Sequence, residues 1–175
     1  MNNNLANYMY DETNPFIFMG FDHVVSIIFF LILSISIPYL ARKYLNEKQQ
    51  HILGSVIGGF VLLGYLSWVI LELIAGTFSL KLHLPFHLCR TANILMFIVL
   101  VFRSHLAYEI VFFWGLTVIH AVITPDITQG FPHYHFIRYW LTHQMMIIGI
   151  IYACLLYTSD AADDTPCVDL GGRRI

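Results

Sequence analysis

The sequence predicts an all-α protein, a polytopic bundle of transmembrane helices. Hydrophobic residues make up 58% of its 175 residues, and charged residues only 11%. In soluble domains roughly a quarter of all residues are charged, so this chain cannot cover a water-facing surface in the usual way. Five apolar stretches are each close to the length that crosses a bilayer. A formal net charge of −2 without a basic patch gives no signal of nucleic-acid binding.

Residues 1–22 are expected to form an extracytoplasmic leader. The segment lacks the basic region of a cleavable signal peptide, so the first membrane helix itself would direct insertion. Asn14 suits the cap of a helix and Pro15 its first turn, which predicts a short interfacial helix over residues 16–21. Its aromatic side chains would lie at the level of the lipid headgroups.

The predicted bundle covers residues 23–157. Its five spans are residues 24–40, 52–71, 84–102, 108–124 and 139–157. The first span ends near Pro38, and a basic loop follows it. The second contains Gly54 and Gly58, a spacing that lets two helices approach closely. This pattern indicates packing within the bundle, with helix–helix self-association as the alternative. Pro85 favours an extended segment at the start of the third span.

Basic residues in the short loops predict the orientation of the bundle, because cytoplasmic loops carry an excess of Lys and Arg. One side of the predicted bundle holds Arg42, Lys43, Lys48 and Arg103, and the other holds Lys81, Arg90 and Arg138. The compact first loop decides between the two sides. We therefore expect a multi-pass protein of the bacterial cell membrane with its N-terminus outside.

The composition changes abruptly after Tyr157. Residues 158–175 have no apolar helical face, and parts of them resemble translated sequencing-adapter text. We therefore expect a non-native tail, a native reading frame that is cut near Leu155, and at least one missing span. We therefore do not expect Cys167 to take part in the chemistry of the protein. The three cysteines lie in surroundings too different for a disulfide framework.

Residues 83–90 form the most polar stretch of the bundle, with two histidines, a thiol and a guanidinium. Polar groups are costly in hydrocarbon, so an ionisable cluster against a membrane span indicates a functional site. The predicted topology brings further polar residues to the same side from the fourth and fifth spans and the loop between them. These residues are His120, Asp126, His133, His135 and His143.

Cys89 suits nucleophilic catalysis, provided that a neighbouring imidazole removes the proton of its thiol. His143 would be that base if the third and fifth spans are neighbours, and His87 or His120 would serve in the same way. The thiolate would form a thioester with an acyl group. Arg90 would steady a lipid phosphate.

Three other interpretations stay open at this point. The first is a metal site, although no stretch has the spacing of a zinc site. Its ligands would be His83, His87, Cys89, His133 and His135. The second is a path for protons or a solute, in which Glu72 and Asp126 act with the histidines. In the third, these residues pair with one another and with water and hold the bundle together.

Three segments taken together resemble the YwaF-like family of small bacterial integral membrane proteins. They are residues 84–89 (LPFHLC), residues 113–116 with 124–126 (FWGL and TPD), and residues 131–133 (FPH) leading to His143. His23 also fits, and the resemblance covers residues 16–155. The family is similar, more distantly, to the eukaryotic transmembrane protein 164 among the polytopic lipid-acyl enzymes. This sequence departs from the family pattern at Arg90 and His120.

The resemblance implies six or seven membrane helices, of which five are present, and an acyl-transfer site with Cys89 as nucleophile and His143 as base. We expect a thiol-dependent lipid acyltransferase or lipid hydrolase at the outer leaflet, with a membrane lipid as partner and no cofactor or metal. His87 or Asn93 would orient the reacting groups. The expected substrate-binding residues are His23, Arg90, Asn93, His120, Asp126 and His133. The alternative is a non-enzymatic binding or transport protein with a polar His/Cys site for a solute or metal.

Overall fold

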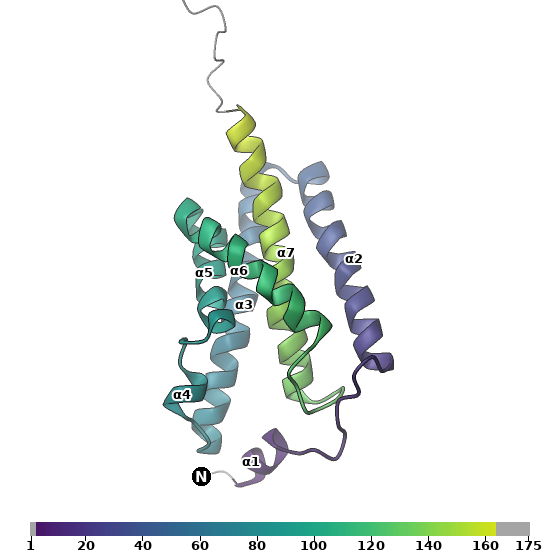
Figure 1. The fold of residues 1–175 in the computed structure, drawn as a ribbon. Coiled ribbons are helices and arrows are strands. Elements are labelled where there is room, and N and C mark those ends of the chain that lie inside the picture. Colours follow the sequence, from purple (N-terminus) through teal and green to yellow (C-terminus); the bar gives the residue numbers. More distant parts are fainter. Residues whose placement is uncertain (1–2, 164–175) are drawn as a thin grey trace, which may run out of the picture.

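A computed structural model describes the backbone of residues 3–163, and all of its regular elements there are helices (Figure 1). They are α1 (Asn3–Met9), α2 (Phe21–Tyr44), α3 (Glu47–Ala75), α4 (Leu80–His83), α5 (Leu88–Phe102), α6 (His105–Ile123) and α7 (Tyr134–Asp163). The described residues form no strand beyond an isolated bridge between Pro15 and Gln129. The predicted all-α class is therefore confirmed.

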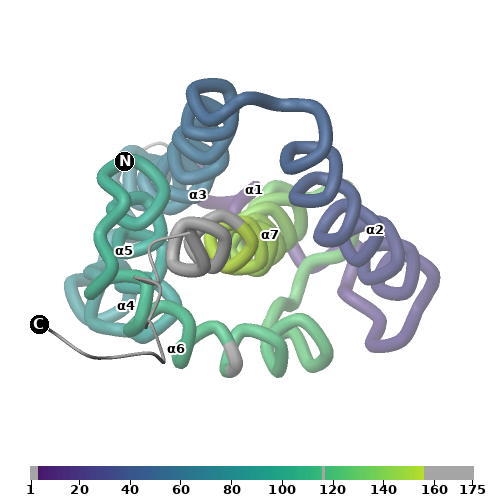
Figure 2. The backbone as a smooth tube through the Cα atoms, turned by 90° about the horizontal axis from the view of Figure 1, so that it is seen from above, coloured from purple at the N-terminus to yellow at the C-terminus, as the bar shows by residue number. Residues whose placement is uncertain are grey.

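The five long helices run alternately up and down the bundle, with α7 in the middle (Figures 1 and 2). Helix α7 packs against α2, α3, α5 and α6, and α5 packs against α3 and α6. The third and fifth predicted spans, which correspond to α5 and α7, are therefore neighbours, as the catalytic interpretation of the sequence required.

The long helices carry the apolar surface of a membrane protein. Helices α2 and α3 are each long and apolar enough to cross a bilayer. Helix α6 adds a third if its halves, His105–Gly115 and Thr117–Ile123, which bend by 40°, are counted as one span. Helix α5 is apolar but shorter. Length and composition thus support two or up to three spans among the described helices, and the count of five stays a prediction.

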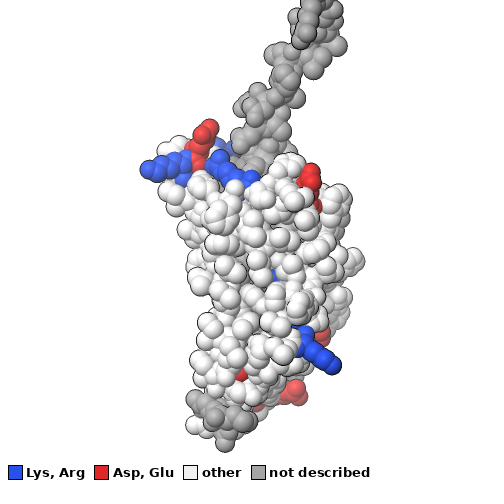
Figure 3. All heavy atoms as spheres, turned by 90° about the vertical axis from the view of Figure 1, so that its left-hand side faces the viewer, with Lys and Arg blue, Asp and Glu red and all other residues white. Residues whose placement is uncertain are grey.

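The surface agrees with a membrane location. On α2, the side chains of Leu31, Ile32 and Ile35 are each at least 58% exposed, which is where lipid would cover them. In the view of Figure 3, the charged side chains gather at the two ends of the molecule, and a largely uncharged band lies between them. Because water would not cover such a band favourably, a bilayer is its natural solvent.

Helix boundaries follow local rules that extend the predicted spans. Asn46 and Gln49 form a capping box that begins α3, and Gly76 ends that helix with a left-handed φ of 76°. Helix α2 continues through Pro38 to Tyr44, beyond the predicted end of the first span. Helix α7 begins at Tyr134 rather than at residue 139, because the His133 Nδ1 atom accepts the backbone N–H of His135.

The leader differs from its prediction. A helix over residues 16–21 was expected, but residues 16–20 form turns and the N-terminal helix is α1. The reason is a pairing with the distant loop before α7. The Phe16 N–H donates to the Thr128 carbonyl, and the Gly130 N–H donates to the Asn14 carbonyl. The Asn14 amide, which was expected to cap a helix, donates instead to the Phe131 carbonyl.

Only part of the predicted non-native tail lies within the described residues. Helix α7 continues to Asp163, so residues 158–163 extend the bundle's central helix. The remainder of the predicted non-native tail, with Cys167, lies outside the described residues.

Glycines let the central helices approach one another closely. A Cβ atom at Gly58 would lie 3.3 Å from the Phe97 Cα and Leu100 Cβ atoms of α5. A Cβ atom at Gly54 would lie 3.3 Å from the Tyr152 ring of α7. The prediction that this small-residue pattern serves packing inside the bundle is therefore confirmed.

Gly58 and Gly59 offer a matched test of this packing. The Gly58→Leu side chain must displace α5, and overpacking of this kind costs about 1–3 kcal/mol. The Gly59→Leu variant should keep its stability, because a Cβ atom at Gly59 meets nothing within 4 Å. Thermal unfolding of the two purified proteins in detergent measures the difference, and equal melting temperatures would contradict the packing.

Candidate functional site

Helices α3, α5 and α7 bring several polar side chains around Trp68 of α3, which is buried. The Arg90 guanidinium carbon lies 4.7 Å from the centre of the Trp68 ring, and that of Arg138 lies 4.5 Å from it. The His83 and Trp68 ring centres are 4.6 Å apart. We call these four residues, together with Glu72, the Trp68 cluster.

Glu72 supplies the carboxylate of the cluster and is 1% exposed. The Trp68 Nε1–H donates to its Oε1 atom at 2.9 Å, and the Tyr10 hydroxyl donates to its Oε2 atom at 3.0 Å. The Thr77 hydroxyl also donates to Oε2. These donors satisfy a buried carboxylate that would otherwise be very costly. Glu72 therefore joins the leader and the end of α3.

His83 completes the surroundings of this carboxylate. Its Nδ1 atom lies 2.8 Å from the Ser79 nitrogen and 3.0 Å from the Ser79 oxygen, so it accepts from the N–H or donates to the carbonyl according to the tautomer of the ring. The Nε2 atom lies 3.7 Å from the Glu72 Oε1 atom. The Tyr65 hydroxyl donates to the His83 carbonyl at 2.8 Å. His83 is thus held on both its backbone and its ring, and it belongs to the framework of the cluster.

The two guanidinium groups of the cluster lack a carboxylate partner. Within residues 3–155, no carboxylate lies within salt-bridge distance of Arg90 or Arg138. Arg90 donates one long hydrogen bond, 3.5 Å, to the Leu84 carbonyl. The Nε atom of Arg138 is buried and has no hydrogen-bond partner. Two cations therefore stand against one carboxylate that is already fully engaged.

Arg138 also lines a hollow of about 280 Å³ between α3 and α7. Phe60, Leu63, Leu141 and Met145 give this hollow apolar walls. Ser67 and Tyr134 stand with Arg138 as its polar lining, and their two hydroxyl groups lie 2.9 Å apart in a hydrogen bond. The hollow thus combines an apolar wall with a cationic group.

Cys89 and His143 lie on the neighbouring helices α5 and α7, and both are half-buried. The His143 Nδ1–H donates to the Tyr139 carbonyl at 2.9 Å, which leaves Nε2 as the proton acceptor of the neutral ring. The Tyr139 ring stacks on His143 with ring centres 4.1 Å apart, and its hydroxyl is in electrostatic reach of the Cys89 thiol. No hydrogen bond joins Cys89 to His143 among the described residues.

The other expected catalytic helpers flank Cys89. His87 precedes α5 in an extended conformation and is exposed, and its Nε2–H donates to the Lys81 carbonyl at 3.3 Å. Asn93, one turn after Cys89 on α5, is 6% exposed, and its buried Oδ1 atom has no hydrogen-bond partner. A buried amide acceptor beside the thiol is available to a ligand's donor group.

The remaining expected binding residues lie elsewhere. His23 is fully buried, and both ring nitrogens are in use, one by the Met19 N–H and one by the Val122 carbonyl. His133 donates to the Tyr8 carbonyl and stacks on the Tyr8 ring, which holds α1 in place. The exposed residues His120 and Asp126 are near the end of α6 and in the loop after it. The structure does not join these four residues to the Trp68 cluster.

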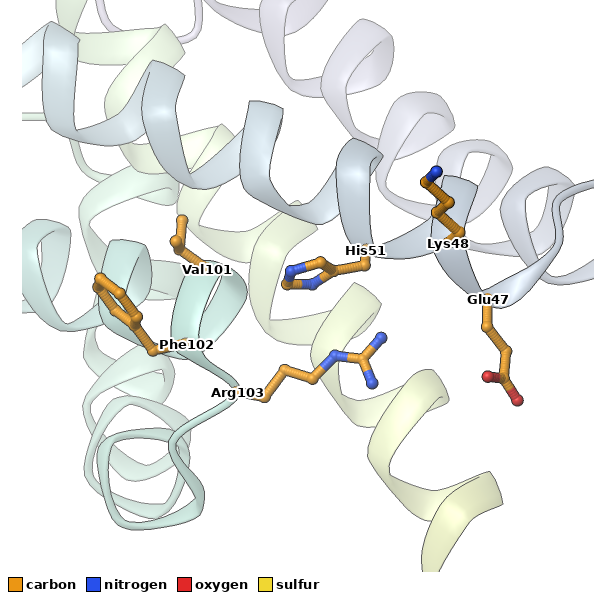
Figure 4. A pocket seen from close by; sticks show the side chains of 6 residues that line it. All are labelled: Glu47, Lys48, His51, Val101, Phe102 and Arg103. Atoms are coloured by element: carbon orange, nitrogen blue, oxygen red, sulfur yellow. The ribbon is translucent and has the colours of Figure 1, made fainter.

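A second hollow, of about 510 Å³, opens at the opposite end of the bundle (Figure 4). His51 from α3 and Arg103 after α5 point toward one another there, whereas Glu47 points away. Lys48 and Arg103 thus lie at the same end, as the grouping of basic residues in the sequence predicted. The hollow is open, and its lining residues lie near the start of α3 and the end of α5.

The metal interpretation finds no assembled ligand set in the described part of the chain. No group of three or more His, Cys, Asp or Glu side chains is close enough there to hold a metal ion. His83 is the last residue of α4, whereas His87, four residues later, lies in the connection before α5.

Comparison with known protein families identifies the chain. A sequence model of the TMEM164 family matches residues 18–162. The chain belongs to the TMEM164 family. Membership and the apolar helices together assign this TMEM164-family protein to a membrane. The narrower resemblance to YwaF-like proteins stays a prediction. No curated protein and no solved structure matches the chain.

Sequence reasoning did not single out Trp68, Arg138 or Tyr139 as site residues. Trp68 lies four residues before Glu72 on α3, so the spacing alone places the two on one helix face. Arg138 is a charge within the second turn of α7, and a charge in an apolar helix was the available signal. The sequence did not indicate which other helices these three side chains would contact.

Substitution of Glu72 tests whether the Trp68 cluster holds the bundle together. In Glu72→Gln, one amide oxygen must replace two carboxylate oxygens, which leaves buried donors unpaired at a cost of about 3 kcal/mol. The control is Glu109→Gln, because Glu109 is 56% exposed in its pair with His105 and should matter little. Thermal unfolding in detergent measures both, and similar small effects would refute the structural role of Glu72.

The contact of the leader with α3 should depend on pH. Burial, and then the hydrogen bond and charge of Glu72, raise the pKa of Tyr10 above its ordinary value of 10.0. The stabilisation from this shift is fully present below pH 10 and is lost as the pH rises through the raised pKa.

The Tyr10→Phe variant should therefore be less stable than the parent protein by about 1 kcal/mol at neutral pH. The gap should narrow above pH 10, whereas a Tyr44→Phe control at the far end should show no such gap. Thermal unfolding across this pH range provides the measurement. A gap that is constant with pH would exclude titration of Tyr10 as the cause.

Proposed function

We propose that this protein transfers or hydrolyses a lipid acyl group by means of the Cys89 thiol. The observation that carries the proposal is the state of His143. Its Nδ1–H is held by the Tyr139 carbonyl, so its free Nε2 atom is oriented as a proton acceptor on the helix that packs against Cys89's helix. Family membership supports a membrane setting for this chemistry.

The reaction would proceed in two steps. The His143 Nε2 atom takes the thiol proton, and the Cys89 sulfur attacks the ester carbonyl of a lipid. The ester C–O bond then breaks, a thioester forms, and the leaving alkoxide receives the proton from His143. In the second step an acceptor alcohol, or water, attacks the thioester and restores the thiol. The Asn93 amide beside Cys89 would orient the acyl group.

Substrate binding would have to close this site, because Cys89 and His143 are not hydrogen-bonded to each other. Catalytic hydrogen bonds often form only in the complex with substrate. Tyr139 stacks on His143, and its hydroxyl donates to the Ala121 carbonyl at 2.6 Å. The required rearrangement would therefore bring Cys89 and His143 together around a tyrosine that is held at both its ring and its hydroxyl.

The proposal includes the topology that the sequence predicted. Five passes through a bacterial cell membrane, with the N-terminus outside, would place the Trp68 cluster and Cys89 near the outer leaflet. The leader, residues 1–22, would lie outside the bundle of residues 23–157. The partner would be a membrane lipid, and self-association of the helices stays an alternative.

A non-enzymatic lipid- or solute-binding protein is the second candidate. The observation that favours it is the Trp68 cluster itself. Its two guanidinium groups have no carboxylate partner within residues 3–155, so they are suited to binding an anion whether or not a reaction follows. The two candidates differ in whether the protein turns the lipid over, because only the first candidate uses the Cys89 thiol in a reaction.

Acyl transfer is tested with purified protein and vesicles that contain a phospholipid with a radiolabelled acyl chain. We expect label to become attached to Cys89, to be released by neutral hydroxylamine, and to be absent in Cys89→Ala. Cys154→Ala is the matched control and should keep the label. His143→Gln should slow turnover by about 100-fold or more. Full turnover by the Cys89→Ala protein would reject Cys89 as the nucleophile, and a lack of both label and turnover in the unmodified protein would favour the binding protein.

A further inference from the structure

We propose that Arg138, supported by Arg90, binds the phosphate of an anionic phospholipid whose acyl chain occupies the hollow between α3 and α7. The proposal rests on the proposed function insofar as it names the substrate class of that site. The binding itself needs only the hollow and the two arginines, so it can be tested separately from catalysis.

The hollow opens toward the lipid. Its wall residues Phe60 and Leu63 on α3 are 58% and 63% exposed, and Leu141 on α7 is 42% exposed. In a membrane these side chains face acyl chains. A volume of about 280 Å³ lies near the lower limit of ligand pockets, about 300 Å³. It therefore accommodates a segment of one acyl chain, while the rest of the lipid stays in the bilayer.

The polar lining of the hollow provides what a phosphate requires. Arg138 lines the hollow, and its Nε atom is buried without a hydrogen-bond partner, so the guanidinium has unused donor capacity, which a ligand would reach at Nε only after a shift of the side chain. A guanidinium group binds phosphate oxygens with two parallel hydrogen bonds. The Ser67 and Tyr134 hydroxyl groups line the same hollow, but Ser67 donates to the Gly64 carbonyl and Tyr134 to Ser67, so either would have to release its present bond before it donates to a phosphate.

The charge of the Trp68 cluster points to an anion. Arg90 and Arg138 both contact the Trp68 ring, and Glu72 is the carboxylate of the cluster. Glu72 accepts hydrogen bonds from Trp68, Tyr10 and Thr77, and its nearest charged-type neighbour is His83. One positive charge is thus left over in a poorly hydrated position, and a phosphodiester carries the one negative charge that balances it.

A phospholipid suits this site better than free phosphate does. The ligand must present a phosphate at Arg138 and an apolar group along Phe60 and Leu63 at the same time. Inorganic phosphate would make no contact with the apolar walls of the hollow. An uncharged diacylglycerol would leave Arg138 and Arg90 unbalanced. The shared requirement is a phosphate joined to an acyl chain.

The test uses the full chain in phosphatidylcholine nanodiscs that contain phosphatidylglycerol with a photoactivatable acyl chain. We expect crosslinks to α3 and α7 at the walls of the hollow, identified by mass spectrometry. A diacylglycerol probe with the same chain should label these walls about tenfold less, since it lacks the charge-assisted hydrogen bonds. Equal labelling by both probes, or competition by inorganic phosphate as strong as by the lipid, would overturn the proposal.

Variants assign the binding to the named residues. Arg138→Gln should reduce labelling by phosphatidylglycerol about tenfold. Arg42→Gln, which removes a cation at the other end of the bundle, should not. Leu63→Trp keeps Arg138 but narrows the hollow, so it should also reduce labelling even if Arg138→Gln fails to fold. Unchanged labelling in Leu63→Trp would overturn the proposed position of the chain.

The Cys89→Ala protein separates this proposal from the proposed function. It should bind and crosslink phosphatidylglycerol normally while it fails to transfer the acyl group. Normal crosslinking with unaffected turnover would retain the lipid site and reject the thiol mechanism. Loss of site-specific crosslinking in the unmodified protein would reject the lipid site even if Cys89 forms a thioester.

Discussion

The central position of α7 is the constraint on which the rest of the structure depends. Four other helices pack around it, and such close contact requires small side chains at the crossings. Gly64 of α3 faces Thr142, Gly115 of α6 faces Ile150, and Gly149 of α7 itself faces Met96. Because these crossings fix α7, its second and third turns are held against α3 and α5, where the candidate site lies.

This arrangement gives one end of the bundle an unusual balance of charge. Glu72 is buried and satisfied by donors from the leader, from α3 and from the segment after it. Arg90 and Arg138 reach the same tryptophan from two other helices, and neither has a carboxylate within salt-bridge distance in residues 3–155. Glu72 is buried and fully bonded, whereas Arg90 and Arg138 are half-buried and without a carboxylate in those residues, so the cluster keeps a cationic side beyond its structural network.

The sequence offered residues of suitable chemistry for a site but not their arrangement. Cys89 and His143 were singled out by chemical type, and their helices are indeed neighbours. His23 was chosen from the family resemblance and His133 as a polar residue on the same predicted side, but the structure uses their ring nitrogens to hold α2 and α1. A histidine's role depends on what its two nitrogens contact, and those contacts come from distant parts of the chain. The leader's turns had the same origin, since the partner of Asn14 is the loop before α7.

Composition and local pattern by themselves determined that this protein is helical, apolar and suited to a membrane, and they located the five long helices, but not α1 or α4, to within a few residues. These properties follow from hydrophobicity and from helix-capping rules that act over a few residues. Only the tertiary structure decided that Arg138 meets Trp68 and lines a hollow with an apolar wall. The reason is that helix crossings depend on which small side chains allow close approach. That choice is shared between segments far apart in the chain, so no single stretch contains it.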